Sequence, residues 1–116
     1  MILKDRKSLR YIKELQPQFF DDMVKIVIDD ERQLVAVNME MHSDLGIELY
    51  DDGSKDEDLY GANIYYSDGT IEWSSTLNIR QNRHIQNGTF GRVITHEETI
   101  ARLTGIVDRW IDRQER

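Results

Sequence analysis

The chain has 116 residues, the length of one domain with its own core, and we expect a single domain over residues 1–116. The absence of cysteine excludes disulfides, thiolate zinc sites and cysteine nucleophiles. The net charge of −7 disfavours nucleic acid and anionic membranes as partners, and no apolar run suits a signal peptide or a membrane span, which predicts a cytoplasmic protein.

The N-terminal third of the chain predicts a short strand, a helix and a β-hairpin. Residues 2–4 are expected to form an edge strand. A helix is expected to begin after Ser8, a good N-cap, and to end before Pro17, which cannot continue it. Residues 23–28 are rich in β-branched side chains, and residues 34–41 follow a polar turn, so these two segments are predicted to pair as strands.

Three more strands are predicted in the middle of the chain. Apolar and polar side chains alternate over residues 46–50, which is typical of a strand with one buried face. Residues 59–66 and 70–79 flank the dipeptide at residues 68–69, Asp-Gly, which is a strong hairpin signal. Residues 81–94 are polar and are expected to form a loop.

The C-terminal segment predicts the clearest helix. Thr95 and Glu98 fit a capping box, in which each side chain bonds to a backbone amide near the start of the helix. Apolar side chains then recur with the helical period on one face. They are Ile100, Leu103, Val107, Trp110 and Ile111.

Together these elements predict an α+β fold. Short links between consecutive strands favour a single antiparallel meander sheet of five or six strands. The two predicted helices are expected to pack on one face of that sheet. The other face would then be wholly or partly exposed, with room for a ligand groove or a dimer interface.

Several polar side chains are expected to share one face of this sheet or the loops beside it, because side chains alternate between faces along a strand. The candidate ligand-binding residues are Glu40, His42, Glu48, Asp52, Ser54, Asn63, Asn78, Arg80 and Asn82. An imidazole, carboxylates, amides and a guanidinium suit ligand binding or acid–base chemistry. The alternative is the ordinary polar face of a half-exposed antiparallel sheet.

The charged side chains are distributed unevenly along the chain. Residues 44–58 hold seven acids and one lysine, whereas residues 73–96 hold no acid but contain Arg80, Arg83 and Arg92. The simplest interpretation is two solvated loops of opposite sign. A site for an anionic ligand on the basic segment is the sharper alternative.

Metal and nucleophile sites are less favoured. Glu40 and His42 would share a strand face, with Asp44 or Glu48 nearby, and magnesium or manganese would suit such a set better than zinc. Ser54 lacks a nucleophile-elbow pattern. No metal ligand is therefore assigned, and the sequence leaves open both the cofactor and whether the protein is an enzyme.

Four segments resemble a small prokaryotic domain-of-unknown-function family, number 5674. They are residues 39–44, 52–54, 58–63 and 77–82. The resemblance covers most of the chain, from about residue 23 to the final helix, and it implies no activity, substrate or cofactor. It implies that a subset of the candidate residues belongs to the family signature, namely Glu40, His42, Asn63, Asn78 and Arg80.

Two functional hypotheses follow. The first is a binding module or cryptic enzyme for a small polar or anionic ligand, in which Arg80 pairs with the anion, Asn63 and Asn78 orient the ligand, and Glu40 with His42 supplies acid–base or metal-binding capacity. The second is a non-catalytic interaction protein that forms a homodimer through the uncovered sheet face.

Overall fold

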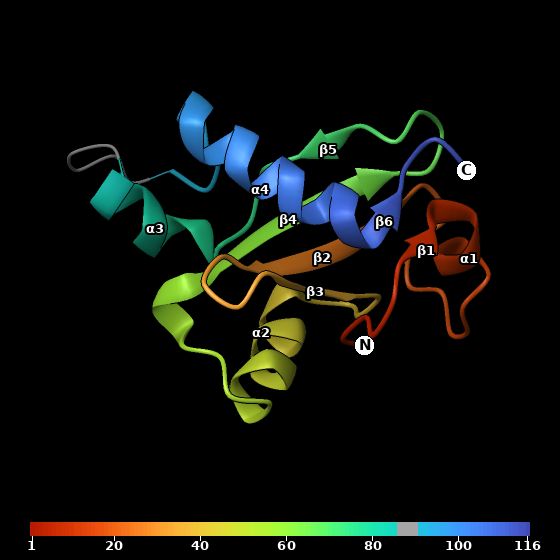
Figure 1. Ribbon diagram of the computed structural model, residues 1–116, viewed down its shortest axis with the longest axis horizontal. Helices are drawn as coiled ribbons and strands as arrows, with labels where there is room; N and C mark the ends of the chain where they lie inside the picture. Colours follow the sequence, from red (N-terminus) through yellow and green to blue (C-terminus); the bar gives the residue numbers. More distant parts are fainter. Residues whose placement is uncertain (86–90) are drawn as a thin grey trace.

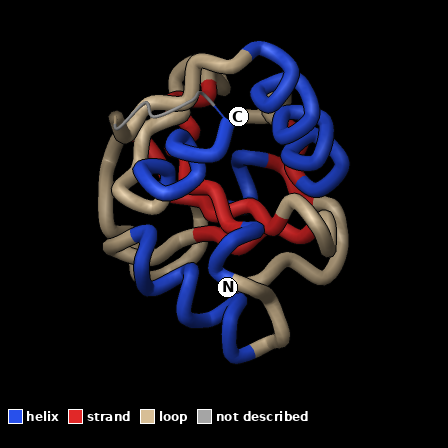
Figure 2. The backbone as a smooth tube through the Cα atoms, turned by 90° about the vertical axis from the view of Figure 1, so that its left-hand side faces the viewer, coloured by secondary structure: helices blue, strands red, loops and turns tan. Residues whose placement is uncertain are grey.

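The computed structural model describes residues 1–85 and 91–116, and its centre is an antiparallel sheet with helices on both faces (Figures 1 and 2). Among the described residues this sheet has four strands in the order β3-β2-β4-β5. The strands are β2 (Met23–Asp29), β3 (Leu34–Val37), β4 (Leu59–Tyr65) and β5 (Ile71–Glu72). A second, two-stranded parallel sheet pairs β1 (Lys7–Ser8) with β6 (Ile111–Asp112).

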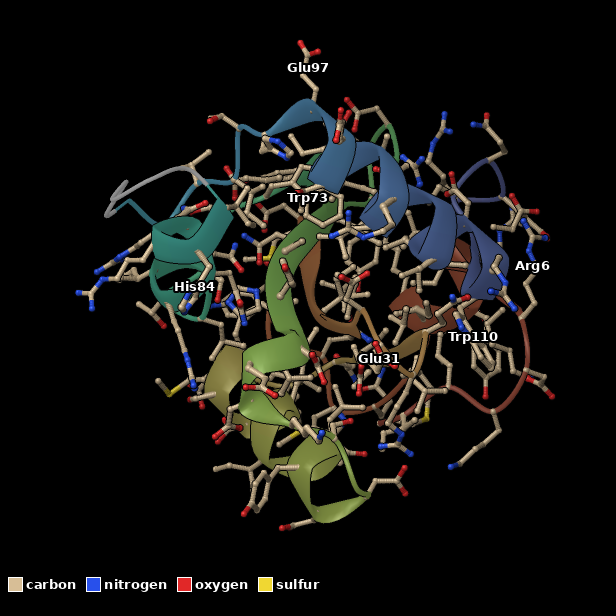
Figure 3. The ribbon with its side chains drawn as sticks, turned by 60° about the vertical axis from the view of Figure 1, so that its left-hand side comes forward. Arg6, Glu31, Trp73, His84, Glu97 and Trp110 are labelled. Carbon is tan, nitrogen blue, oxygen red and sulfur yellow. The ribbon has the colours of Figure 1, made fainter. Side chains whose placement is uncertain are left out.

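One face of the sheet carries the larger apolar core. Helix α4 (Glu97–Trp110) lies across it, and the short helix α1 (Leu9–Lys13) packs into the same cluster. Alternate strand residues supply the sheet's side of this core, which includes Ile26, Ala62 and Ile64. In Figure 3, α4 runs between the labelled Glu97 and Trp110, across the sheet from α2. We call this side the α4 face.

The opposite face is covered by helix α2 (His42–Asp51), and helix α3 (Asn78–Ile85) packs beside it at β4. A 3₁₀ turn, η1 (Asp56–Asp58), leads from α2 into β4. A smaller apolar cluster lies between α2 and the strands and includes Val27, Leu45 and Leu49. We call this side the α2 face.

Several predicted elements are confirmed. The fold is α+β, and Ser8 caps α1 by accepting a hydrogen bond from the Tyr11 amide at 3.0 Å. The hairpin of β2 and β3 forms, and the Asp-Gly turn joins β4 to β5, with Gly69 at φ +74°. The helix near the C-terminus also forms, but its N-cap is His96, whose side chain accepts from the Thr99 amide. The predicted cap at Thr95 was therefore one residue too early.

The single meander of five or six strands was wrong. The strand predicted over residues 34–41 ends at Val37, and residues 46–50 lie inside α2. The reason is that His42, Leu45, Gly46 and Leu49 are buried together at i, i+3, i+4 and i+7, the spacing of one helix face. The apolar alternation over residues 46–50 was a shorter and misleading pattern.

The strand predicted over residues 70–79 was also too long. It ends at Glu72, and α3 begins at Asn78. The loop predicted over residues 81–94 therefore contains the second half of α3, while residues 86–90 of that loop lie outside the described residues. The predicted edge strand at residues 2–4 is reduced to isolated pairing with β3, where the Leu3 amide donates to the Val35 carbonyl at 2.9 Å.

The two predicted helices, α1 and α4, do pack into the same apolar cluster on one face, but the prediction that the other face is wholly or partly exposed was wrong. Helix α2 occupies the face that the homodimer hypothesis required to be open. That hypothesis therefore loses its structural motive. Within the part of the chain that the structure describes, no helix combines the length and the apolar character needed to cross a bilayer.

Candidate functional site

A pocket of about 270 Å³ opens on the α2 face, at the point where α2 begins. Its walls come from β2, the start of α2, β4, the turn after β5 and the segment that leads into α4. The lining residues are Lys25, Met41, His42, Ser43, Asn63, Ser74, Ser75, Thr76 and Arg92. We call this the His42 pocket.

His42 is held in this pocket by the backbone of β4. Its Nε2 lies 2.8 Å from the Ala62 carbonyl oxygen, and the residue is 8% exposed. Because a carbonyl only accepts, Nε2 carries the proton, and Nδ1 is the basic nitrogen of the neutral ring. The pKa of His42 is lowered from its usual 6.5, mainly by burial and also by the charge of Lys25. The hydrogen bonds with the Ala62 carbonyl and the Asn63 amide act in the opposite direction and raise the pKa.

Gly61 allows the pocket walls to approach each other. A Cβ on this residue would lie 2.4 Å from both Cβ and Oγ of Ser75, and 3.3 Å from Cδ2 of His42. Any side chain at position 61 would therefore push Ser75 and His42 off the strand. The missing side chain lets Ser75 and His42, which both line the pocket, lie close to β4.

Asn63 and Lys25 lie opposite each other on adjacent strands, on the same face as the pocket. The Asn63 Nδ2 donates to Glu72 Oε1 at 2.8 Å. Its Oδ1 is buried, and among the described residues no group bonds to it with ordinary hydrogen-bond geometry. An orphaned acceptor of this kind costs stability, so it suits an added donor, either the protonated His42 imidazole, which the Asn63 amide favours, or a group on a ligand.

The lining is electropositive in a protein that is acidic overall. Lys25 and Arg92 contribute two cations, and none of the described residues that line the pocket is Asp or Glu. The Lys25 ammonium lies 5.3 Å from the centre of the Phe20 ring, and within the described ranges no carboxylate pairs with either cation. Such a set attracts an anion.

The rest of the lining supplies hydrogen-bonding groups. The hydroxyls belong to Ser43, Ser74, Ser75 and Thr76. The Ser75 Oγ already accepts from the Leu77 amide at 3.2 Å. Helix α2 begins here without a side-chain cap, so its positive end also favours an anion.

Two candidate amides are structural. Asn78 is fully buried; its Oδ1 accepts from the Gly61 amide and its Nδ2 donates to the Gly61 carbonyl, both at 2.8 Å. Strand β5 does not extend far enough to pair with Gly61, so the Asn78 side chain takes the place of a neighbouring strand. Asn82 is equally buried and donates to the carbonyls of Gly91 and Val93.

Three other candidates hold loops and the chain start in place. Arg32 donates to Ser54 Oγ at 2.9 Å and to Asp52 Oδ2 at 2.7 Å, which ties the β2–β3 turn to the end of α2. This guanidinium lowers the pKa of Asp52. Glu48 accepts from the N-terminal ammonium of Met1 at 3.0 Å. None of the three lines the His42 pocket.

The last two candidates lie elsewhere. Glu40 is exposed before α2 and does not line the pocket. Arg80 is exposed on α3 and lines a different groove. The prediction that Glu40, His42 and Arg80 share one sheet face was therefore wrong, because His42 and Arg80 belong to helices. Of the nine candidates, the His42 pocket brings together only His42 and Asn63.

The residues that sequence reasoning did not place in the site are the two cations and the hydroxyl side chains after β5. Arg92 lies in the acid-free segment at residues 73–96, which was proposed to bind an anionic ligand, so the charge pattern of that segment did indicate part of the site. Lys25 could have been found from strand parity, because it shares a face with Val27 and pairs with Asn63. Ser74 and Ser75 carried no comparable signal.

A metal centre finds no support in the described residues. Nowhere in residues 1–85 and 91–116 do three or more His, Asp or Glu side chains gather closely enough to hold an ion. The alternative set of Glu40, His42, Asp44 and Glu48 does not assemble, because Glu48 binds the chain start and His42 binds Ala62.

Comparison with known proteins gives one finding. No curated protein and no solved structure matches the chain. A family model described as "Protein of unknown function (DUF5674)" matches residues 1–110. The chain belongs to the DUF5674 family.

Proposed function

We propose that the His42 pocket binds a small molecule that carries an anionic group, such as a carboxylate or a phosphate, and a hydroxyl or amine beside it. The observation that carries this proposal is that Lys25 and Arg92 both line a pocket whose described lining residues include no acid, on a chain with a net charge of −7. Unpaired cations that face one cavity are favoured where a ligand supplies the opposite charge.

Each part of the lining has a role in this proposal. Arg92 offers a forked guanidinium to the anion, and Lys25 offers a point charge from the sheet. The hydroxyls after β5 bond to the remaining polar atoms of the ligand. The unsatisfied Asn63 Oδ1 favours a ligand with a hydroxyl or amine donor.

His42 gives the pocket a base. Its lowered pKa keeps the free imidazole neutral near pH 7, with Nδ1 able to take a proton. An anion bound beside the ring favours the protonated form, so ligand binding and proton uptake by His42 are coupled. This coupling makes acid–base chemistry on the ligand possible, and binding is the step that the proposal requires.

The test is thermal unfolding with inorganic phosphate and with lactate, each compared with chloride at the same ionic strength. A native-state ligand at about 100 times its Kd raises the free energy of unfolding by about 2.7 kcal/mol. We expect phosphate or lactate to raise the Tm of the wild type. Arg92→Gln should abolish most of this rise, because it removes an exposed cation of the pocket without disturbing the core.

The matched control is Lys55→Gln, which removes one positive charge from an exposed loop that does not line the pocket. This variant should keep the full rise in Tm. Equal rises in phosphate, lactate and chloride, or a rise that Arg92→Gln leaves intact, would contradict the proposal. A cytoplasmic location and the absence of nucleic-acid partners stay predictions from the composition of the chain.

A further inference from the structure

A second cavity, chemically different from the His42 pocket, lies between α2 and α3. Its volume is about 420 Å³, and its lining residues are Ser43, Gly46, Ile47, Tyr50, Asp56, Leu59, Leu77 and Arg80. Figure 3 shows the two helices that bound it, α2 and the neighbouring α3 with its labelled His84. We call this cavity the Gly46 groove.

The walls of the Gly46 groove are mostly apolar. Leu59 and Leu77 belong to the small apolar cluster beneath α2. On the helix itself, Ile47 is 60% exposed and Tyr50 is 59% exposed, one turn apart on the side that faces the groove. Large apolar side chains that gather around a hollow are a common feature of ligand sites.

Gly46 opens the floor of the groove. It lies inside α2, where glycine is unfavourable for a helix, yet no strained φ or close contact requires it. A Cβ at this position would meet Leu59 Cδ1 at 3.8 Å and Leu77 Cδ1 at 3.9 Å, which is ordinary van der Waals contact. The space that an alanine methyl would fill is therefore left open to a ligand.

Arg80 places one positive charge at the groove. The structure gives its side chain no ion pair and no hydrogen bond with any described residue. Asp56 also lines the groove, and its carboxylate disfavours a ligand with more than one negative charge. With one cation and one acid in the lining, the groove tolerates at most one negative charge on the ligand, placed at Arg80 and next to an apolar body.

We propose that the Gly46 groove binds a small monocarboxylic acid with an aromatic or branched aliphatic body. The carboxylate pairs with Arg80, and the apolar body lies over Gly46 between Leu59 and Tyr50. This site is independent of the His42 pocket; the two share only Ser43 in their linings.

The experiment is a titration of the full chain with phenylacetate, followed by ¹H–¹⁵N NMR. Two related probes separate the requirements: phenylacetamide keeps the ring but lacks the charge, and acetate keeps the charge but lacks the ring. We expect phenylacetate to shift the amide signals of Gly46, Ile47 and Leu77, and both other probes to bind at least about fivefold more weakly, since each lacks one of the two contacts.

Two variants and one matched control locate the site. Arg80→Gln should weaken phenylacetate binding about fivefold, the value of one exposed ion pair. Gly46→Ala should weaken binding while the fold is kept, because its methyl group fills the floor without a clash. Arg83→Gln, on the same helix but outside the lining, should leave binding unchanged.

Three results would overturn the proposal. The first is unchanged phenylacetate affinity in Arg80→Gln, and the second is a set of shifted amides that lies away from the groove. The third is self-association: a dimer in sedimentation at NMR concentration, with the same α2 amides shifting on dilution, would show that a second copy covers the groove. Loss of phosphate binding at the His42 pocket has no bearing on these readouts.

Discussion

The two faces of the sheet are built by different means. On the α4 face, β2, β4 and α4 contribute buried apolar side chains such as Ile26, Ile64 and Leu103. On the α2 face, the strands present Lys25, Gly61 and Asn63 beside Val27, and the buried Asn78 amide of α3 bonds to Gly61. An apolar face gives stability and a defined core, whereas a polar face demands a partner for every group.

This difference separates stability from function. Where the amides of α3 meet backbone groups, the polar face is satisfied and closed, as at Asn78 and Gly61. Asn63 Oδ1 and the two cations lie at the His42 pocket, where the face is open to a ligand. Asp29 Oδ2 is also buried without a partner among the described residues, but Asp29 does not line this pocket, so an unsatisfied atom alone does not mark the site.

The largest expected effect is on the α4 face. Leu103→Ala should lower the free energy of unfolding by about 2–5 kcal/mol, because it leaves a cavity under α4 at a residue with no exposed surface. Urea denaturation measures this change. Leu103→Met, which nearly keeps the volume, should cost less than about 1.5 kcal/mol. Equal losses in the two variants would show that packing does not govern this face.

On the α2 face the same kind of volume-keeping change should be costly. Asn78→Leu should lower the free energy of unfolding by about 2–4 kcal/mol, because the amide and carbonyl of Gly61 would be buried without partners. Urea denaturation again gives the value. A cost below that of Leu103→Met would mean that the amide is not needed to replace a strand.

A smaller loss of stability is expected when a glycine of the α2 face, Gly61, is replaced, and a glycine of α4, Gly105, serves as the comparison. Gly61→Ala should cost about 1–3 kcal/mol, since its Cβ would overlap Ser75, and it should also remove the rise in Tm caused by phosphate. Gly105→Ala on α4 is the control: a Cβ there meets nothing within 4 Å, and we expect a gain of about 0.5–1 kcal/mol. A Gly61→Ala variant with wild-type stability would contradict the described closeness of Ser75.

The smallest effect concerns pH. Because the pKa of His42 in the fold lies below its usual 6.5, the neutral ring contributes stability that is present above pH 6.5 and is lost as the pH falls through the folded pKa. The difference in stability between wild type and His42→Gln should therefore decrease as the pH falls from 7 to 5. Thermal melts across this range measure it, and a difference that grows on acidification would reverse the sign of the pKa shift.

The sequence predicted the α4 face better than the α2 face for a physical reason. The apolar period of α4 and the Asp-Gly turn after β4 are local signals, and both were confirmed. Helix α3 was missed because the residues on its buried side include three amides, and hydrophobic periodicity does not register amides. Asn78 was predicted to bind a ligand because the sequence does not show that its side chain is already hydrogen-bonded to the Gly61 backbone.

Part of the His42 pocket could be predicted from the sequence. His42 and Asn63 were among the candidates, and the acid-free segment contained Arg92. The error was in the secondary structure: α2 was treated as a strand although His42, Leu45 and Leu49 already had helical spacing. A wrong period gives every side chain different neighbours, so the predicted cluster combined residues that the structure separates.

The most direct test of the anion-binding account is the pKa of His42 itself, followed by NMR of its ring signals with and without phosphate. We expect a pKa below 6.5 in chloride, and a rise when phosphate binds beside the ring. The rise should vanish when both Lys25 and Arg92 are replaced by Gln. A pKa that phosphate leaves unchanged in the wild type, at concentrations that saturate any effect on Tm, would contradict an anion site at His42.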